Sequence, residues 1–132
     1  MLANIVPLSV TAQPPNVLFL LVDDMGYNDV SYHNGGDPRT AGWTTTPAID
    51  KLASRGVRLE RYYTNPICSP SRATIMSGRY TIRTGIQHGC YSVKQATGLP
   101  LAETTLPQAL KAASAAGGFA GYETWGLGKW HL

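Results

Sequence analysis

The sequence has only two cysteines, Cys68 and Cys90, and no long apolar run. Two cysteines are too few for the disulfide framework of a small secreted domain, and their spacing does not match a zinc-binding motif. Two pairings stay open: Cys68 with Cys90, or Cys90 with a thiol outside the chain. No segment approaches the roughly 20 consecutive apolar residues that span a bilayer, so we expect no membrane span.

Charge is also scarce. Charged residues make up 14% of the chain and hydrophobic residues 43%, which is typical of a soluble globular protein. The net charge of +3 comes from basic residues spread along the chain, and the nearest approach to a cluster is Arg55, Arg58 and Arg61. A nucleic-acid interface normally has a denser basic patch. We therefore expect no nucleic-acid partner, and a small anionic substrate suits the chain better.

Residues 1–15 are expected to be a leader or the remnant of a signal sequence. The first twelve residues are mostly apolar, and Val10-Thr11-Ala12 is similar to a small-residue cleavage site. No Lys or Arg precedes the apolar stretch, however, and Pro7 interrupts it. An unstructured leader is the alternative.

Residues 16–22 form a continuous apolar run, which predicts a strand buried on both faces, as in a parallel sheet covered by helices. A helix is expected next, with Thr46 as N-cap, Pro47 at its first position and Gly56 at its end. Alternation over residues 57–63 then predicts a half-exposed strand. The order strand, helix, strand indicates an α/β fold.

Two further helices are expected, one starting just after Cys68 and ending at Gly78, the other from about Thr105 through Ala116. Residues 122–127 read as another strand. Residues 27–45 are polar and turn-rich, with the clearest loop signal at residues 34–38, and residues 80–103 are expected to be irregular.

Asp23 and Asp24 follow the first expected strand directly. Ligand sites in open parallel sheets collect at this edge. Two adjacent carboxylates repel each other unless a cation or hydrogen-bond donors lie between them, and their oxygens suit Ca²⁺ or Mg²⁺. The alternative is a solvated turn.

The run Cys68-Ser-Pro-Ser-Arg-Ala-Thr-Ile-Met-Ser-Gly-Arg79 places a cysteine at the start of an expected helix. A helix N-terminus offers unpaired N–H groups and partial positive charge, both suited to an oxyanion. Arg72 adds a planar donor that is always charged. A buried structural cysteine is the alternative.

This run resembles the signature of the sulfatase family, Cys-x-Pro-Ser-Arg with Gly-Arg following. Gly128-Lys129-Trp130-His131-Leu132 and Asp23-Asp24-Met25-Gly26 are similar to two other family segments, in the family's order. The resemblance covers nearly everything from Asn16 to Leu132. Thr84-Gly85-Ile86-Gln87-His88 and Leu99-Pro100-Leu101 are most similar to the arylsulfatase B group, which includes N-acetylgalactosamine-4-sulfatase.

The resemblance implies an alkaline-phosphatase-like sandwich with a mainly parallel central sheet, of which residues 16–132 are expected to be only the N-terminal part. It implies a sulfuric ester hydrolase acting on a glycosaminoglycan or an aryl sulfate. A formylglycine-generating enzyme is an implied partner, and the implied compartment is the secretory pathway, lysosomal or extracellular.

The resemblance also implies the residue roles. Cys68 is oxidised to formylglycine, whose hydrate attacks sulfur and later releases sulfate. Asp23 and Asp24 bind Ca²⁺, which also contacts the side chain at position 68. Arg72 and Lys129 hold that side chain, and His131 removes a proton.

The chain departs from the family pattern in two respects. The family's other metal ligands (an Asp-Asn pair), a further His and a further Lys are absent, so we expect no turnover from these 132 residues alone. The stretch 115–122 is longer than in relatives, which puts Lys129 and His131 in question. Two alternatives remain: a phosphodiester or phosphonate hydrolase of the same superfamily, and an inactive fragment that acts as a binding module.

Overall fold

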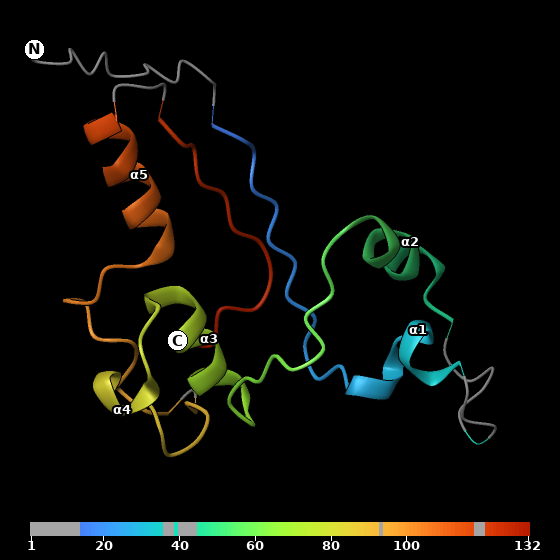
Figure 1. The fold of residues 1–132 in the computed structure, drawn as a ribbon. Coiled ribbons are helices and arrows are strands. Elements are labelled where there is room, and N and C mark those ends of the chain that lie inside the picture. Colours follow the sequence, from blue (N-terminus) through green and yellow to red (C-terminus); the bar gives the residue numbers. More distant parts are fainter. Residues whose placement is uncertain (1–13, 36–38, 40–44, 93, 118–120) are drawn as a thin grey trace, which may run out of the picture. The chain divides into compact units, whose positions relative to one another are not determined.

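The computed structural model describes residues 14–35, 39, 45–92, 94–117 and 121–132. Its described residues fall into two compact units (Figure 1). The Cys68 unit comprises residues 14–18 and Asn65–Leu132, and the Asp23 unit comprises Phe19–Thr64. Residues 1–13 of the expected leader lie outside the described part of the chain.

The Asp23 unit contains the expected helix as α2, Pro47–Arg55, preceded by the short helices η1, Tyr27–Asp29, and α1, Ser31–Asn34. The predicted bounds of α2 are confirmed, because Pro47 opens it and Gly56 is its C-cap. The two short helices η1 and α1 lie in the turn-rich stretch 27–45, and the sequence did not predict them. The Asp29 carboxylate accepts a hydrogen bond from the Gly26 N–H at 2.6 Å, and this closes η1.

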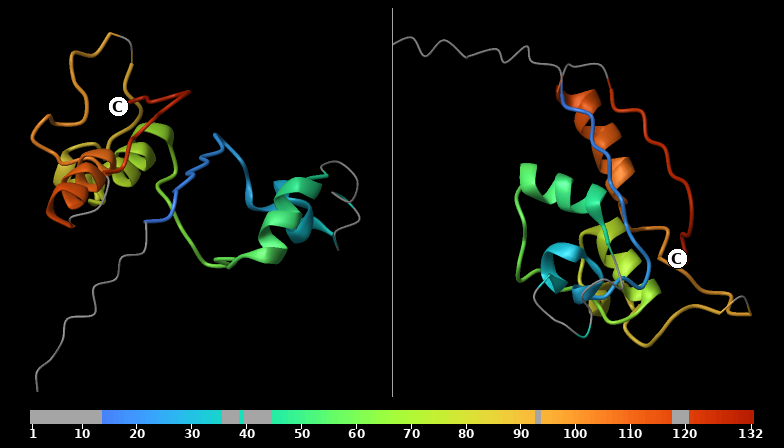
Figure 2. Two further views of the ribbon diagram at one scale, coloured as in Figure 1. Left: turned by 90° about the horizontal axis from the view of Figure 1, so that it is seen from above. Right: turned by 90° about the vertical axis from the view of Figure 1, so that its right-hand side faces the viewer.

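The Cys68 unit contains α3, Cys68–Ser77, α4, Thr81–Thr84, and α5, Leu106–Gly117. The start of α3 is one residue earlier than predicted, and its end is as predicted. Gly78 has φ 65° and donates its N–H to the Thr74 carbonyl at 2.8 Å. This left-handed conformation favours glycine. Both α4 and α5 contact α3, and the three helices gather together in both views of Figure 2.

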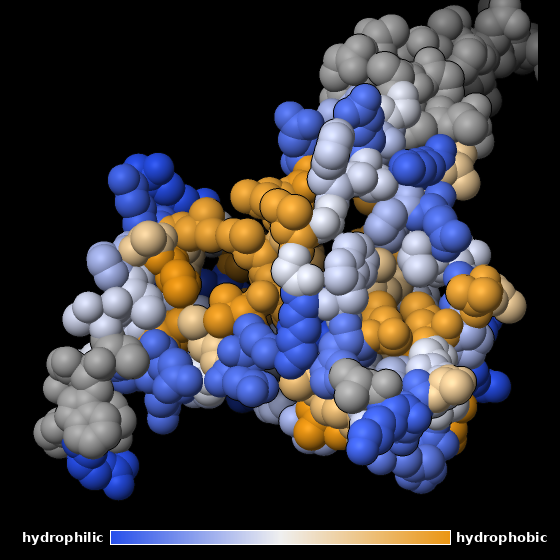
Figure 3. All heavy atoms as spheres, turned by 180° about the vertical axis from the view of Figure 1, so that it is seen from behind, coloured by the Kyte–Doolittle hydropathy of each residue, from blue (hydrophilic) through white to orange (hydrophobic). Residues whose placement is uncertain are grey.

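The expected sheet is not observed: the described parts of the chain contain no strand. Residues 16–22 and 122–127 have no regular secondary structure, and a turn at residues 60 and 61 interrupts the strand expected over residues 57–63. A strand is stable only when a neighbour completes its hydrogen-bond ladder and covers its apolar face. Here Leu18 is 83% exposed and Leu20 71% exposed, and such apolar side chains lie open on the surface in Figure 3.

Each unit buries few large side chains among its described residues. Val30 is the buried apolar residue of the Asp23 unit, and Ala73 and Ile86 are those of the Cys68 unit. The order of each unit therefore depends strongly on hydrogen bonds, and polar contacts also hold the candidate site together. None of the helices in the described ranges has the length and apolarity needed to cross a membrane.

Candidate active site

Cys68 is the first residue of α3 and is half-buried. The turn that leads into it is held by Ser71, whose hydroxyl donates to the carbonyls of Asn65 and Ile67, each at 2.8 Å. The N–H of Ser71 also donates to Ile67, at 3.2 Å. These hydrogen bonds fix the backbone that carries Cys68.

Arg72 lies one turn further along α3 and is only 9% exposed. Its guanidinium Nη1 donates to the main-chain carbonyl of Lys129, a residue far away in the sequence. A charged, buried donor with a defined partner is one of the stronger hydrogen bonds in a protein. Arg72 thus ties the Gly128–Leu132 segment to the helix that carries Cys68.

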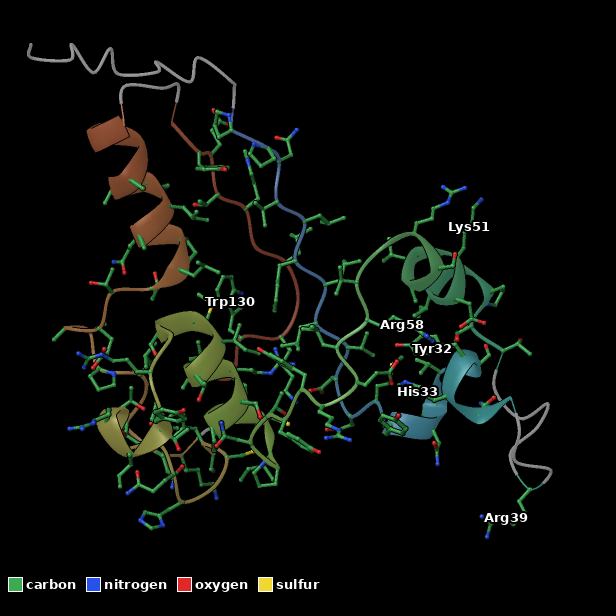
Figure 4. All side chains as sticks on the ribbon, viewed as in Figure 1. Tyr32, His33, Arg39, Lys51, Arg58 and Trp130 are labelled. Atoms are coloured by element: carbon green, nitrogen blue, oxygen red, sulfur yellow. The ribbon has the colours of Figure 1, made fainter. Side chains whose placement is uncertain are left out.

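The Lys129 ammonium group donates to the Cys68 Sγ at 3.3 Å. The turn that presents it begins at Gly128, which has φ 98°, a value that side chains with a Cβ rarely adopt. The ring of Trp130, labelled in Figure 4, packs on Gly126, where a Cβ would come within 2.6 Å of two ring carbons. Glycines at 126 and 128 thus give the turn its shape.

His131 is also part of this cluster, with an uncommon φ of 54°. Its Nε2 lies 2.8 Å from the Tyr91 carbonyl oxygen. A carbonyl only accepts, so Nε2 carries the proton and Nδ1 of the neutral ring has the lone pair. Nδ1 is buried and has no hydrogen-bond partner among the described residues.

Tyr91 and Ser69 complete the cluster, and sequence reasoning missed both. The N–H of Tyr91 donates to the hydroxyl of the fully buried Ser69 at 3.1 Å, while its carbonyl accepts from His131. Ser69 occupies the variable position of the Cys-x-Pro-Ser-Arg motif, and Tyr91 belongs to no motif. The contacts of Ser69 and Tyr91 depend on the path that residues 85–92 take, and no local sequence pattern predicts this path.

Cys90 was open to two pairings in the sequence, and the structure contains no disulfide between it and Cys68. One ligand atom each from Cys68, Cys90 and His131 nevertheless lies within 4.8 Å of the others. A hydrogen bond from the Ser69 backbone lowers the pKa of the exposed Cys90 thiol, and hydrogen bonds from Cys68 add to this effect. Unpaired N–H groups at a helix start stabilise a thiolate in this manner.

Asp23 and Asp24 belong to the other unit. Both are exposed, and they form a turn directly after residues 16–22. Asp24 has φ 56°, a left-handed conformation that aspartate tolerates better than most residues. The structure therefore brings Cys68, Arg72, Lys129 and His131 together in one unit, and it places Asp23 and Asp24 on a turn of the Asp23 unit.

Aromatic and charged side chains stabilise the segment that follows this turn. The rings of Tyr27 and His33 stack with centroids 3.8 Å apart, and His33 Nε2 lies 3.2 Å from a Glu60 carboxylate oxygen. The Arg58 guanidinium lies 5.5 Å from the centroid of the Tyr32 ring (Figure 4). These contacts hold η1 and α1 in place beside the carboxylates.

Comparison with known proteins agrees with the motifs. A family model described as sulfatase matches residues 15–132. Arylsulfatase J of Mus musculus is 46% identical over 118 residues, which cover 89% of this chain and 17% of the relative. Arylsulfatase A of Bos taurus is 39% identical over 122 residues, covering 92% of this chain and 22% of the relative.

N-acetylgalactosamine-6-sulfatase of Sus scrofa is 39% identical over 128 residues, covering 91% of this chain and 22% of the relative. The chain thus spans about a fifth of the length of these curated relatives. Their names do not single out the arylsulfatase B group suggested by the sequence. The match over most of the chain, together with the three motifs in family order, shows that this chain belongs to the sulfatase family.

Proposed function

We propose that residues 16–132 are the N-terminal part of a sulfatase catalytic domain that hydrolyses sulfuric esters. The observation that carries this proposal is the hydrogen bond from Lys129 Nζ to Cys68 Sγ. It joins the nucleophile position of one family motif to the cation of another. The substrate class we propose is an aryl sulfate or a sulfated sugar of a glycosaminoglycan, since the relatives named above are arylsulfatases and an N-acetylgalactosamine sulfatase.

Formylglycine formed from Cys68 would supply a hydrated aldehyde as nucleophile, a form of covalent catalysis. The surroundings of position 68 suit an oxygen-bearing side chain. The Lys129 ammonium already donates to the atom at this position and can donate equally to oxygen. Lys129 would orient this side chain and offset negative charge that develops on the sulfate group.

Arg72 would act at least by positioning, because its guanidinium Nη1 donates to the Lys129 carbonyl and so fixes the backbone of that residue. His131 would act as a base. Its protonated Nε2 is anchored on Tyr91, which leaves the Nδ1 lone pair to take a proton from a hydroxyl at position 68. A general base of this kind typically contributes about 10²–10⁴-fold to the rate.

Asp23 and Asp24 fit a calcium ion in the chemistry of their donors, because both offer exposed carboxylate oxygens and Ca²⁺ takes oxygen ligands. A bound ion would neutralise charge on the sulfate group. Two carboxylates provide at most about four of the 6–8 oxygens that Ca²⁺ requires. We therefore expect the 132-residue chain alone to show no turnover.

We further propose a secretory, lysosomal or extracellular location, since the enzyme that forms formylglycine acts during secretion. A formylglycine-generating enzyme would then be an obligatory partner. Mass spectrometry of the Cys68 peptide from protein produced with and without that enzyme tests this step directly. Unchanged cysteine at position 68 in both samples would contradict it.

Activity is best measured on the longest natural protein that carries residues 16–132, made together with the formylglycine-generating enzyme. Hydrolysis of an aryl sulfate is compared with that of an aryl phosphate diester. We expect the sulfate to be preferred, Cys68→Ala to abolish turnover, and His131→Ala to reduce it by about 10²–10⁴-fold. His88→Ala is the matched control, because His88 is exposed and should leave turnover unchanged.

A preference for the phosphate diester would reject the sulfatase proposal. Turnover that survives Cys68→Ala would reject the nucleophile. The 132-residue chain is assayed alongside, and turnover by this chain that Cys68→Ala removes would contradict the expectation that it is inactive alone.

A further inference from the structure

The cluster around Cys68 contains more metal-binding chemistry than sulfate ester hydrolysis uses. Cys90 belongs to none of the three motifs. Its sulfur, the sulfur of Cys68 and one ring nitrogen of His131 nevertheless lie within 4.8 Å of one another. Neither cysteine is part of a disulfide. Two thiols and an imidazole form a donor set that soft or borderline metal ions favour over calcium or magnesium.

The hydrogen bonding of His131 provides an independent observation that points to a ligand. Histidines that bind metals usually donate their other ring N–H to a backbone carbonyl or carboxylate, which fixes the tautomer. His131 has this arrangement, since Nε2–H donates to the Tyr91 carbonyl at 2.8 Å. The remaining nitrogen, Nδ1, is buried and unsatisfied within the described residues, an arrangement that carries an energetic cost unless a partner binds.

We propose that Cys68, Cys90 and His131 form a zinc-binding site that exists only while residue 68 is still a cysteine. Zn²⁺ accepts two cysteine sulfurs and one histidine nitrogen in tetrahedral sites, with a water molecule in the fourth position. Binding replaces the two thiol protons, which pass to solvent, and involves no change of oxidation state. This site does not depend on the proposed hydrolase function, because it requires the thiol rather than formylglycine.

The geometry needs only a small adjustment. In a tetrahedral site with Zn–S bonds of about 2.3 Å and a Zn–N bond of about 2.0 Å, the donor atoms are roughly 3.5–3.8 Å apart. The two sulfurs and one ring nitrogen of His131 lie within 4.8 Å of one another, so each edge has to close by roughly 1.0–1.3 Å at most. Cys90 is exposed and lies in a stretch without helix or strand, where a shift of this size disturbs no packed core.

Residue 68 would then be either a zinc-bound cysteine or formylglycine, but never both. A zinc ion held by the Cys68 thiolate shields this sulfur, so the precursor cannot be oxidised at position 68 while zinc is bound. Conversion to formylglycine removes one of the two sulfur ligands and ends zinc binding. Zinc binding would therefore protect unmodified Cys68 from oxidation.

The test uses the 132-residue chain made without the formylglycine-generating enzyme, kept in a non-thiol reductant, with intact mass confirming two thiols. Zinc affinity is measured by competition with a chromophoric chelator. Cobalt is used as a spectroscopic substitute, because its sulfur charge-transfer absorption reports thiolate ligands directly. We expect one metal ion per chain and a charge-transfer band.

Cys90→Ser and His131→Ala should each weaken zinc binding by at least about 100-fold, since loss of an outer-shell partner alone typically costs about 10–100-fold. His88→Ala removes an exposed histidine outside the cluster and should bind as the parent chain does. Cys90 is exposed, so its variant should retain the parent's far-ultraviolet circular dichroism. Absence of zinc binding, equal affinity of Cys90→Ser and the parent, or equal loss in His88→Ala and His131→Ala would overturn the proposal.

Discussion

The contact between Arg72 and the Lys129 carbonyl should contribute more to stability than any other single arginine contact described above. Arg72→Met keeps the apolar stem of the side chain but removes the guanidinium group and its donors. The variant loses a hydrogen bond made by a charged group, worth about 1.5–3 kcal/mol. A loss of about 2 kcal/mol lowers the folding equilibrium constant roughly 30-fold.

Urea unfolding followed by tryptophan fluorescence measures this loss. The slope of unfolding free energy against urea is about 1–3 kcal/mol per molar for small proteins, so the midpoint should fall by about 1 M. Arg79→Met is the matched control. The Arg79 guanidinium contacts the Glu103 carboxylate at 3.2 Å, but the Arg79 side chain is 57% exposed. Exposed ion pairs contribute about 0–1 kcal/mol, and the midpoint should therefore move much less.

Equal midpoint shifts in Arg72→Met and Arg79→Met would refute this reasoning, because burial would then have no effect on the strength of the contact. An unchanged midpoint in Arg72→Met would show that the Gly128–Leu132 segment is not held by Arg72. Neither result would bear on the assignment to the sulfatase family, which has its own support.

Three further predictions concern backbone shape and thiol chemistry. Gly126→Ala should displace Trp130, lower the free energy of unfolding by about 1–3 kcal/mol and shift the tryptophan emission. Gly56→Ala is the control, because its added Cβ would meet only a 3.5 Å contact and should leave the emission unchanged. Gly78→Ala should lower the free energy of unfolding in urea by about 1–2 kcal/mol, because Gly78 has φ 65°. An unchanged urea midpoint would mean that the end of α3 adopts another conformation without cost. Because the Cys90 pKa is lowered and the thiolate is the nucleophile, alkylation of Cys90 should reach half its maximal rate at a lower pH than in a peptide of the same local sequence. Equal midpoints in protein and peptide would contradict the hydrogen bonding at the start of α3.

The ends of the helices could be predicted because their signals are local. Pro47 suits the first position of a helix and lacks the N–H that would go unpaired there, and Gly78 adopts the left-handed conformation that ends one. The short helices η1, α1 and α4 were missed, since three or four residues carry too little periodicity to detect. The expected strands were not found, because a strand depends on a partner that local sequence does not specify.

The sequence by itself determined the family and the candidate nucleophile, since Cys68, Lys129 and His131 stand in motifs whose spacing is short and whose order is fixed along the chain. Only the tertiary structure decided how these residues act on one another. It placed the Lys129 ammonium on Cys68, fixed the His131 tautomer through the Tyr91 carbonyl, and brought Cys90 into the same cluster. The physical reason is that these contacts join residues far apart in the sequence, so they depend on the path of the connecting loops rather than on any local pattern.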